Sequence, residues 1–459
     1  MSPDEFRRHG HRVVDWIADY LADPQRYPIL PRMEPGEVSG ALPQSGPERG
    51  EPMEAIFQDF TERIAPAITH WNNPGFMGYF ASSASPPGIL AEMLAAGLNA
   101  NAMLWKTSPA ATELEEVTLD WLRQWLGLPQ PLFGIIFDTA STGVMHAIAA
   151  ARESADPAVR TDGGGRDLVL YTSEHAHNSV EKGAVAIGIG QRNVRKIPAD
   201  SEFRMDTEAL AEAIDRDRAA GLRPFCVVPT VGTTSTSSID PVPAVADIAE
   251  RYGLWMHVDA AYGGSAALAP ELRHVLAGAE RADSMVVNPH KWMGVPFDLS
   301  VLYTRRPEIL KRAFSLVPEY LRTSEDGRAV NFMEYGVPLG RRFRALKLWF
   351  VMRYYGREAM AARIRDHVEW ARELAGMIAS DSRFEVSAPV PLSLVCFRLR
   401  AGDEENRRLL ALVNATGEVF LSHTALGGRI VLRLAIGHYG ASRGHVRRAW
   451  EIIREAAAR

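Results

Sequence analysis

The first hydrophobic pattern along the chain is helical. Apolar side chains recur every three or four residues over residues 5–21, which predicts an amphipathic helix whose apolar face needs a partner surface. Its apolar positions are Phe6, Val13, Val14, Ile17 and Leu21. Residues 24–52 are dense in Pro and Gly, which block helix interiors, so this segment is predicted to be an extended arm.

Short apolar runs alternate with helical stretches through the middle of the chain. The runs are DLVLYT, FCVVPT, LWMHVDA and SMVVNP. This alternation is typical of an α/β fold with a mostly parallel sheet flanked by helices. Such sheets carry their chemistry at the carboxyl ends of the strands. The residues that directly follow these runs are therefore the candidates for a functional site.

The pattern changes at about Gly356, where helices are followed by two strand-like runs and a final helix. The two runs are PLSLVCFRLR and RIVLRLAIG. This arrangement of predicted helices and strands indicates a separate, small α+β unit. For 459 residues, one large and one small domain is the expected organisation.

Composition excludes several classes of protein. Apolar residues make up 46% and charged residues 23%, as in soluble globular proteins, and a net charge of -5 gives no reason to expect a nucleic acid or an anionic membrane as a partner. The cysteines Cys226 and Cys396 match no metal spacing and fit a reducing compartment. The charged start MSPDEFRRHG lacks the apolar core of an export signal, and no apolar stretch reaches the roughly 20 residues of a membrane helix. We expect a cytoplasmic protein.

An acid and a lysine follow two of the predicted strands. Asp259 ends LWMHVDA before a glycine-containing turn, and Lys291 follows SMVV within NPHKW, together with Asn288 and His290. Taken singly, Asp259 could cap a helix and Lys291 could lie on the surface. Pyridoxal phosphate, however, needs a lysine for its Schiff base and an acid for its ring nitrogen. A desolvated lysine is also the more reactive amine. The pair therefore predicts that cofactor.

Two further segments fit the same cofactor and also have simpler explanations. Thr139, Ala140 and Ser141 precede an alanine-rich helical run, where backbone amides and hydroxyls can hold a phosphate or simply cap the helix. His177 follows DLVLYT and could cover a flat aromatic ring. With His175 it could instead bind zinc, but no cysteine cluster or HExxH segment completes such a site, so we predict no metal.

Nearly the whole chain resembles the group II pyridoxal phosphate decarboxylases, and within them the aromatic L-amino acid decarboxylases. The matching segments, in family order, are EFRRHGHRVVDW, THWNNPGFMGYF, SPAATELEEVTLDWL, HVDAAYGGSA, NPHKW and PLGRRFRALKLWF. The resemblance implies the type I, aspartate aminotransferase-like fold, with a mostly parallel seven-stranded sheet in a large domain and a small C-terminal α+β domain. It also implies a homodimer with the active site at the subunit interface. The implied domains are an N-terminal arm on the partner subunit (1–85), a large cofactor-binding domain (86–355) and the small domain (356–459).

The resemblance also assigns residue roles. Lys291 carries the cofactor, Asp259 pairs with its ring nitrogen, His177 stacks on the ring, and Tyr320, in VPEYLRTSEDG, lies on a catalytic loop as the proton donor. Lys291, His177 and Tyr320 are thus the expected catalytic residues. The expected cofactor contacts are Thr139, Ala140, Ser141, His177, Thr234, Asp259, Ala261, Asn288, His290 and Lys291.

The expected substrate is an aromatic L-amino acid of the Trp, Tyr, DOPA or Phe class. Aromatic residues near the expected pocket, including Trp105, could form an apolar slot or be ordinary core. Asn101 and Met103 replace apolar residues of many relatives, and Gly340 lies at a position linked to ring size, where it leaves room for an indole. The expected substrate contacts are Ser82, Trp71, Tyr79, Phe80, Asn101, Met103 and Gly340.

The expected reaction is decarboxylation to the corresponding amine and CO2. In the family a tyrosine at the position of Tyr320 is associated with amine formation and a phenylalanine with aldehyde formation. The alternatives are an aldehyde synthase, a decarboxylase of glutamate or another amino acid, and a metal hydrolase built on His175, His177 and Asp259. A non-enzymatic binding role would leave the Lys291 and Asp259 arrangement without a purpose.

Overall fold

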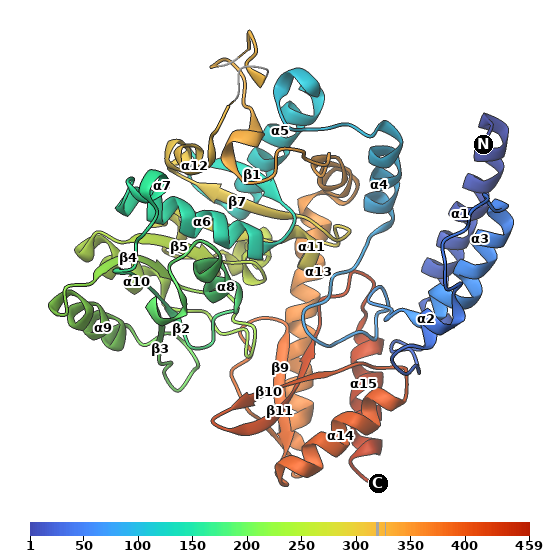
Figure 1. Ribbon diagram of the computed structural model, residues 1–459. Helices are drawn as coiled ribbons and strands as arrows, with labels where there is room; N and C mark the ends of the chain where they lie inside the picture. The colour runs from blue at the N-terminus through green and yellow to red at the C-terminus, as the bar shows by residue number, and fades with distance from the viewer. Residues whose placement is uncertain (318–320, 326) are drawn as a thin grey trace.

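A seven-stranded mixed sheet forms the centre of the molecule (Figure 1). Its order is β1-β7-β6-β5-β4-β2-β3, and only β7 runs antiparallel to its neighbours. The computed structural model describes residues 1–317, 321–325 and 327–459. The sequence prediction of a mostly parallel seven-stranded sheet is confirmed, and its four apolar runs correspond to β2, β4, β5 and β6. The strands are β1 (Phe133–Phe137), β2 (Leu168–Ser173), β3 (Val194–Ile197), β4 (Arg223–Val228), β5 (Trp255–Asp259), β6 (Ser284–Val287) and β7 (Ser300–Thr304).

Helices cover both faces of this sheet, so its central strands are buried on both sides. Alternate residues of a strand enter different cores: in β6, Met285 and Val287 belong to the core that includes α5, α9 and α10, whereas Val286 belongs to the core that includes α6, α8 and α12. Double-sided burial explains why the runs are continuously apolar. The helices of this part are α4 (Pro86–Leu98), α5 (Pro109–Leu126), α6 (Ala140–Ala155), α7 (Val159–Asp162), α8 (Ser179–Ala186), α9 (Thr207–Ala219), α10 (Val242–Tyr252), α11 (Pro289–Trp292) and α12 (Pro307–Phe314).

The long helix α13 (Ala345–Ser380) leads from the large sheet to a small C-terminal unit. It is kinked at Gly356, whose backbone has the left-handed φ of 66°. The small C-terminal unit, residues 381–459, has a four-stranded antiparallel sheet of order β10-β11-β9-β8 covered by helices. The kink lies at the predicted domain boundary, residue 356, and the division itself stays a prediction. The elements of this unit are β8 (Phe384–Val386), β9 (Leu394–Leu399), α14 (Asp403–Ala415), β10 (Ser422–Leu426), β11 (Arg429–Ala435) and α15 (Arg443–Ala456).

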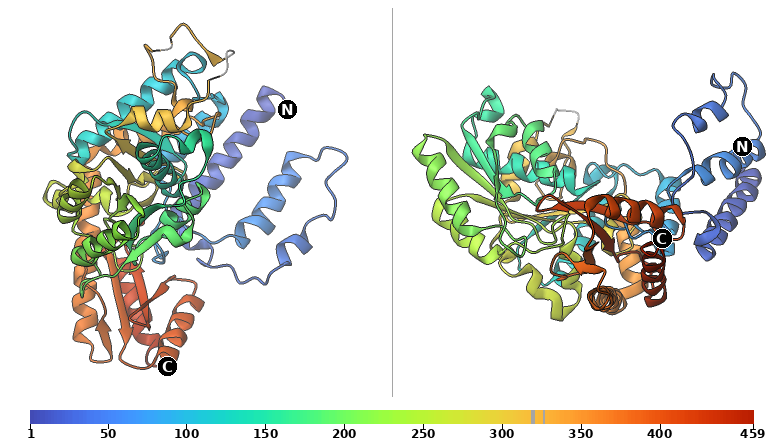
Figure 2. Two further views of the ribbon diagram at one scale, coloured as in Figure 1. Left: turned by 60° about the vertical axis from the view of Figure 1, so that its left-hand side comes forward. Right: turned by 90° about the horizontal axis from the view of Figure 1, so that it is seen from below.

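The N-terminal arm projects from the side of the body (Figure 2). It contains α1 (Pro3–Ala22), α2 (Glu37–Ala41) and α3 (Met53–Asp59). The predicted first helix is confirmed, and Ser2 and Glu5 form a capping box at its start. The Pro- and Gly-rich segment is not extended throughout, because α2 interrupts it. No residue of α1 is buried. Trp16 packs against Phe60, with ring centroids 4.9 Å apart, whereas Phe6 is 70% exposed.

Among the described residues, no helix has both the length and the apolarity required to cross a bilayer.

Candidate active site

A cavity of about 180 Å³ lies at the carboxyl ends of the parallel strands of the large sheet. All ten predicted cofactor contacts line it, together with Phe80. A wider hollow of about 800 Å³ lies between α5 and residues 327–335, but it carries none of them. We call the first the lysine cavity. Its lining residues are Phe80, Thr139, Ala140, Ser141, His177, Ser179, Thr230, Gly232, Thr234, Asp259, Ala261, Tyr262, Asn288, His290 and Lys291.

Lys291 and Asp259 come from neighbouring strands of the sheet. Asp259 ends β5 and is buried, and Lys291 lies on the one-turn helix α11 after β6. Lys291 Nζ lies 5.5 Å from the centroid of the Phe80 ring. Burial lowers the pKa of Lys291, and the negative charge of Asp259 partly opposes that shift. More of the amine is therefore neutral and nucleophilic than in an exposed lysine.

These two charged groups face one cavity without pairing. The backbone N–H of Lys291 donates to Asn288 O at 3.0 Å, but its side chain has no hydrogen bond or ion pair with any described residue. Asp259 Oδ1 accepts only from the backbone N–H of Ala261, at 3.1 Å. A buried acid and a buried amine that remain apart leave room for a group that contacts both. This arrangement fits a cofactor held between them.

His177 carries a defined proton. Its Nδ1 accepts from the backbone N–H of Ser179 at 3.1 Å and lies 2.9 Å from the Ser179 hydroxyl oxygen. The neutral ring therefore carries its proton on Nε2. Burial lowers the pKa of His177, with Asp259 opposing, so the neutral form predominates at pH 7.

The start of α6 has unpaired backbone amides. Thr139 is the N-cap residue of this helix, but no side chain caps it among the described residues. Simple helix capping therefore does not account for this segment. The free N–H groups and the positive end of the helix dipole suit a phosphate.

Two buried polar atoms at the lysine cavity lack a protein partner. They are Asn288 Oδ1 and Thr230 Oγ1. Buried polar atoms are nearly always satisfied in native proteins, so such orphans point to a bound polar group. Together with the acid, the amine and the uncapped helix, they fit pyridoxal phosphate.

Arg433 supports this site, although the sequence analysis missed it. It lies in β11 of the small C-terminal unit and is 4% exposed. Its guanidinium donates to Thr234 O at 2.6 Å, to Ser235 O at 3.0 Å and to Ser422 Oγ at 2.8 Å. It therefore holds the Thr234 loop against the cavity. The sequence did contain a clue to it, because Arg433 lies inside the apolar run RIVLRLAIG, and a charge buried there needs partners.

Thr230, Ser179 and Tyr262 were also missed. Tyr262 stacks on Phe80 with ring centroids 3.7 Å apart, and Trp292 stacks on its other face at 4.8 Å. These rings make one wall of the lysine cavity rigid and apolar. The sequence offered no signal that connects Phe80 with Tyr262, which lies 182 residues later.

Most of the predicted substrate contacts lie outside the lysine cavity of this chain. Trp71 and Tyr79 stack on each other at 5.7 Å and are 39% and 53% exposed. Ser82 is partly buried nearby, and Trp105 borders the wider hollow, where its Nε1 donates to Glu113. Tyr320 lies outside the described residues, so its role stays a prediction.

Asn101, Met103 and Gly340 form a second group. Asn101 Nδ2 lies 3.5 Å from Met103 Sδ, and a Cβ on Gly340 would lie 3.8 Å from the same Nδ2. Asn101 Oδ1 accepts from the backbone N–H of Arg341 at 3.0 Å. The structure thus joins Asn101 and Gly340, which lie 239 residues apart in the sequence, into one cluster.

The metal alternative has little structural support. The imidazole of His175 packs against Phe203, with ring centroids 5.5 Å apart. Within the described ranges, no group of three or more His, Cys, Asp or Glu side chains is arranged to hold a metal ion.

Comparisons with known proteins agree with this cavity. Residues 35–400 match the model of the pyridoxal-dependent decarboxylase conserved domain. The chain is 41% identical to phenylacetaldehyde synthase of Arabidopsis thaliana and 42% identical to aromatic-L-amino-acid decarboxylase of Bos taurus, covering 100% of this chain and 97% of each relative. The crystal structure of Oryza sativa TDC with PLP and tryptamine superposes with a TM-score of 0.97 at 38% identity, covering 100% of this chain and 98% of that one. The chain therefore belongs to the family of pyridoxal-dependent decarboxylases.

Proposed function

We propose that this enzyme decarboxylates an aromatic L-amino acid of the Trp, Tyr, DOPA or Phe class to the corresponding amine and CO2. The observation that carries the proposal is the lysine cavity itself, where a desolvated amine and a buried acid share one space beside an aromatic wall. The names of relatives about 40% identical over the whole chain support the aromatic class.

Each residue of the lysine cavity has a separate role in this reaction. Bound pyridoxal phosphate supplies an electron sink for the electron pair that remains when the carboxyl group leaves. Lys291 holds the cofactor through its amine, and Asp259 keeps a proton on the ring nitrogen by its negative charge. Thr139, Ala140 and Ser141 hold the phosphate, and His177 covers the ring.

The final step returns a proton to the α-carbon. We assign this proton to Tyr320, because the family resemblance places a catalytic tyrosine there. General acids contribute roughly 10²-fold or more. Tyr320→Phe should therefore lower amine formation by about that factor and, with dissolved O2 as the two-electron oxidant, divert product to aldehyde with release of ammonia and hydrogen peroxide. Amine turnover equal to the wild type would refute the assignment.

An aldehyde synthase is the second candidate. The similarity to phenylacetaldehyde synthase of Arabidopsis thaliana favours it, whereas the tyrosine at position 320 favours amine. Product analysis separates the two, because one yields amine and the other aldehyde from the same substrate.

A glutamate decarboxylase is less well supported. The second carboxylate of glutamate needs a free cation, and the nearby cation Arg433 already donates to Thr234 O, Ser235 O and Ser422 Oγ. Its guanidinium, 5.4 Å from the Phe80 ring, thus serves the protein rather than an acidic substrate.

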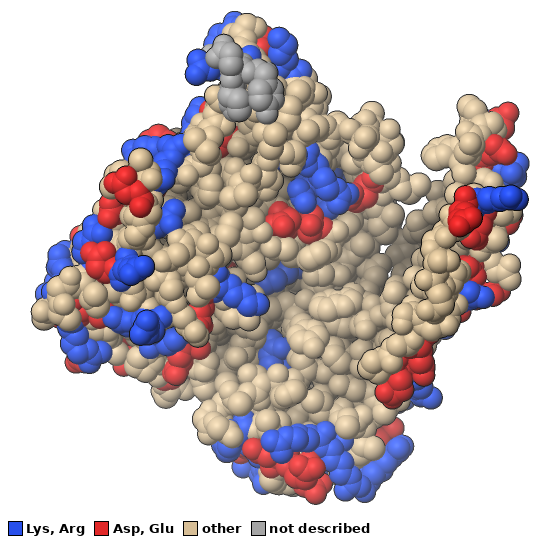
Figure 3. Space-filling model, viewed as in Figure 1, with Lys and Arg blue, Asp and Glu red and all other residues tan. Residues whose placement is uncertain are grey.

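We also propose a homodimer with the active site at the subunit interface. Exposed apolar residues gather on α1 and α4 and on the turn before Gly340, and the hollow between arm and body is bordered mainly by uncharged residues (Figure 3). In this arrangement the Asn101, Met103 and Gly340 cluster lies against the substrate of the other subunit. The apolar residues are Phe6, Val13, Val14, Leu90, Met93, Leu94, Leu98, Val337 and Leu339.

One set of incubations tests the function. The purified enzyme, loaded with pyridoxal phosphate, is given Trp, Tyr, DOPA, Phe or Glu, and amine, aldehyde and CO2 are measured. We expect amine and CO2 in equal amounts from at least one aromatic substrate and none from Glu. Turnover of Glu alone would refute the proposal.

Light scattering tests the proposed homodimer, and it should give twice the chain mass of 50.6 kDa. The cytoplasmic location stays a prediction from the sequence.

A further inference from the structure

His146 lies in α6, the helix whose first residues line the lysine cavity, but the proposed reaction does not use it. Its side chain is fully buried. The imidazole packs between two phenylalanines, with ring centroids 4.2 Å from Phe137 and 4.6 Å from Phe314 of α12. A histidine in such an apolar place needs partners for both of its ring nitrogens.

Both nitrogens have partners, and these define the proton position. Nδ1 lies 2.7 Å from the carbonyl oxygen of Thr142, which can only accept, so Nδ1 carries the proton. Nε2 accepts from the backbone N–H of Val337 at 3.0 Å. Burial lowers the pKa of His146 to about 4, so at neutral pH Nε2 stays an acceptor.

The backbone before Val337 lies directly on the imidazole. A Cβ on Gly336 would lie 2.9 Å from His146 Nε2 and 2.9 Å from Phe137 Cε1, closer than real contacts allow. The φ of Gly336 is -169°, which any residue adopts, so the close approach and not the backbone conformation requires glycine here.

The same segment is anchored again four residues later. The backbone N–H of Arg341 donates to Asn101 Oδ1 at 3.0 Å, and its guanidinium donates to Glu115 Oε1 at 2.6 Å and to Ile136 O at 2.9 Å. Residues 337–340, which we call the arch, span the two anchors. Val337 and Leu339 of the arch are 67% and 47% exposed, and Gly340 ends it beside Asn101 and Met103.

We propose that His146 is a positioning residue that holds the arch in place and thereby sets which aromatic ring the enzyme accepts. This inference rests on the proposed function, in which the arch and the Asn101 cluster lie against the substrate ring. A hydrophobic pocket separates substrates by about 10-fold or more when its walls are held to within a methylene group. If the arch is anchored at only one end, the pocket wall that it forms is no longer held in one position, because a short turn without its anchor samples several conformations.

Two variants at this position separate the hydrogen bond from packing. His146→Phe keeps a ring between Phe137 and Phe314 but cannot accept from Val337. His146→Gln keeps an oxygen that can. The matched control is Tyr171→Phe, which also keeps a buried ring and removes one hydrogen bond, the one that Tyr171 donates to Asp217 Oδ2 at 2.8 Å. Tyr171 belongs neither to the arch nor to the lining of the lysine cavity.

The first measurement is hydrogen exchange of a peptide spanning residues 330–345 in the cofactor-loaded enzyme. We expect His146→Phe to lose protection there, His146→Gln to regain most of it, and Tyr171→Phe to keep it. Unchanged protection in His146→Phe overturns the anchor.

The second measurement is the ratio of kcat/KM for Trp to that for Phe. In His146→Phe we expect this ratio to move toward one by at least about fivefold, mainly through KM, with an unchanged cofactor absorbance. His146→Gln should restore it, and Tyr171→Phe should leave it at the wild-type value. A ratio within twofold of the wild type, or an equal loss of kcat for both substrates, overturns the selectivity role. If the wild type turns over no aromatic amino acid, the proposed function and the ring selection both fail, while the exchange result still decides the anchor.

Discussion

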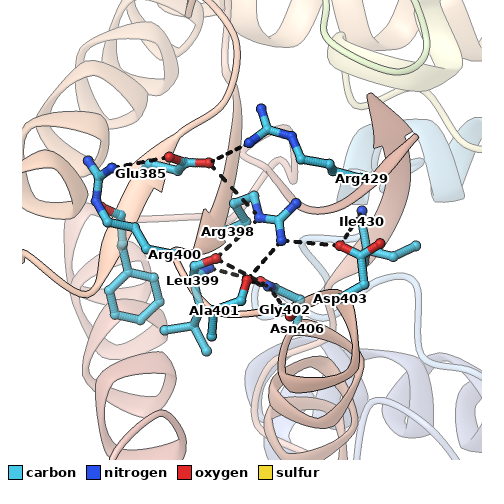
Figure 4. Close-up of polar contacts among 11 residues, drawn as sticks. Glu385, Arg398, Leu399, Arg400, Ala401, Gly402, Asp403, Asn406, Arg429 and Ile430 are labelled. Carbon is cyan, nitrogen blue, oxygen red and sulfur yellow. Dashed lines mark hydrogen bonds and ion pairs between the residues drawn. The ribbon is translucent and has the colours of Figure 1, made fainter. Parts of the chain in front are cut away.

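The lysine cavity and the ion cluster of the small C-terminal unit both enclose a cation, and the two differ in how that cation is paired. Arg398, in β9, is 5% exposed and is surrounded by acceptors (Figure 4). Its Nη2 lies 3.1 Å from Asp403 Oδ1 and 2.9 Å from Ala401 O. Glu385 lies 4.0 Å from Arg398 and 3.3 Å from both Arg400 and Arg429. This cation is held by its partners and is chemically inert.

Lys291 has the opposite environment. It has no ion pair with a described residue, and burial lowers the pKa of its amine. Lys347 provides the contrast within the large domain, because it is 1% exposed but pairs with Glu92. Burial lowers the pKa of both amines, but at Lys347 the hydrogen bond and charge of Glu92 oppose that shift. The difference indicates that reactivity needs burial without a partner, since a paired charge is stabilised and an unpaired buried amine loses its proton more easily.

The largest expected effect is at the unpaired lysine. Lys291→Ala should lower turnover by about 10³-fold or more, because no other amine can hold the cofactor. Borohydride reduction followed by peptide mapping should find no labelled residue. Lys347→Met is the matched control, which should lose stability but keep the label on Lys291. A label that survives in Lys291→Ala would break the comparison.

Removal of the opposing acid should have the next largest effect. Asp259→Asn should lower kcat by roughly 10²- to 10³-fold, as loss of a buried electrostatic group does. It should also lower the pKa of Lys291 further, because Asp259 raises that pKa against the effect of burial. The pH dependence of amine labelling in the cofactor-free protein measures this shift. A pKa that rises or stays constant would show that the two groups do not interact.

In the paired cluster we expect a loss of stability without a loss of chemistry. Arg398→Met should lower the free energy of unfolding by about 3 kcal/mol, because Asp403 loses its cationic partner and two carbonyl oxygens each lose one of their donors. Arg400→Met should cost less than about 1 kcal/mol, because Arg400 is 61% exposed. Urea titration measures both. Normal kcat for each folded variant is expected, and a specific loss of kcat would connect the cluster to the reaction.

The last expected effect is a pH dependence of stability to which two buried histidines near the cavity contribute. Burial lowers the pKa of His257, behind Asp259, to about 4 and that of His290 to about 3. The unfolded chain binds protons at these histidines near pH 6.5 and the folded chain does not. The free energy of unfolding should therefore fall as pH is lowered from about 6.5 toward 4, by at most about 1.4 kcal/mol per pH unit for each histidine.

His257→Asn should remove the contribution of one histidine to this pH dependence, so the free energy of unfolding should change less steeply with pH. Arg398→Met should not change the slope. Thermal or urea unfolding at several pH values measures the slopes. Equal slopes in the wild type and His257→Asn would contradict the assignment.

Local sequence was sufficient for the central part of the site. Asp259 and Lys291 each follow a continuous apolar run, and the carboxyl ends of parallel strands meet at one edge, so their meeting could be predicted. A similar argument covers Thr139 to Ser141, which directly precede a predicted helix, and His177, which follows a predicted strand. The strands β1, β3, β7, β8 and β10 were not anticipated from their sequence patterns.

Contacts between distant segments required the tertiary structure. Arg433 reaches Thr234 across 199 residues, and His146 reaches Val337 across 191. The sequence shows that each residue is polar in an apolar context, but not which backbone group satisfies it.

The sequence by itself determined the fold class, the cofactor and which functional residues follow which strands, because the hydrophobic period and the end of a strand are local properties. Only the tertiary structure decided which polar groups remain unpaired, which helix start is uncapped and which residues form the Asn101 cluster. Those properties depend on how segments far apart in the chain pack together, and burial without a partner exists only after that packing is complete.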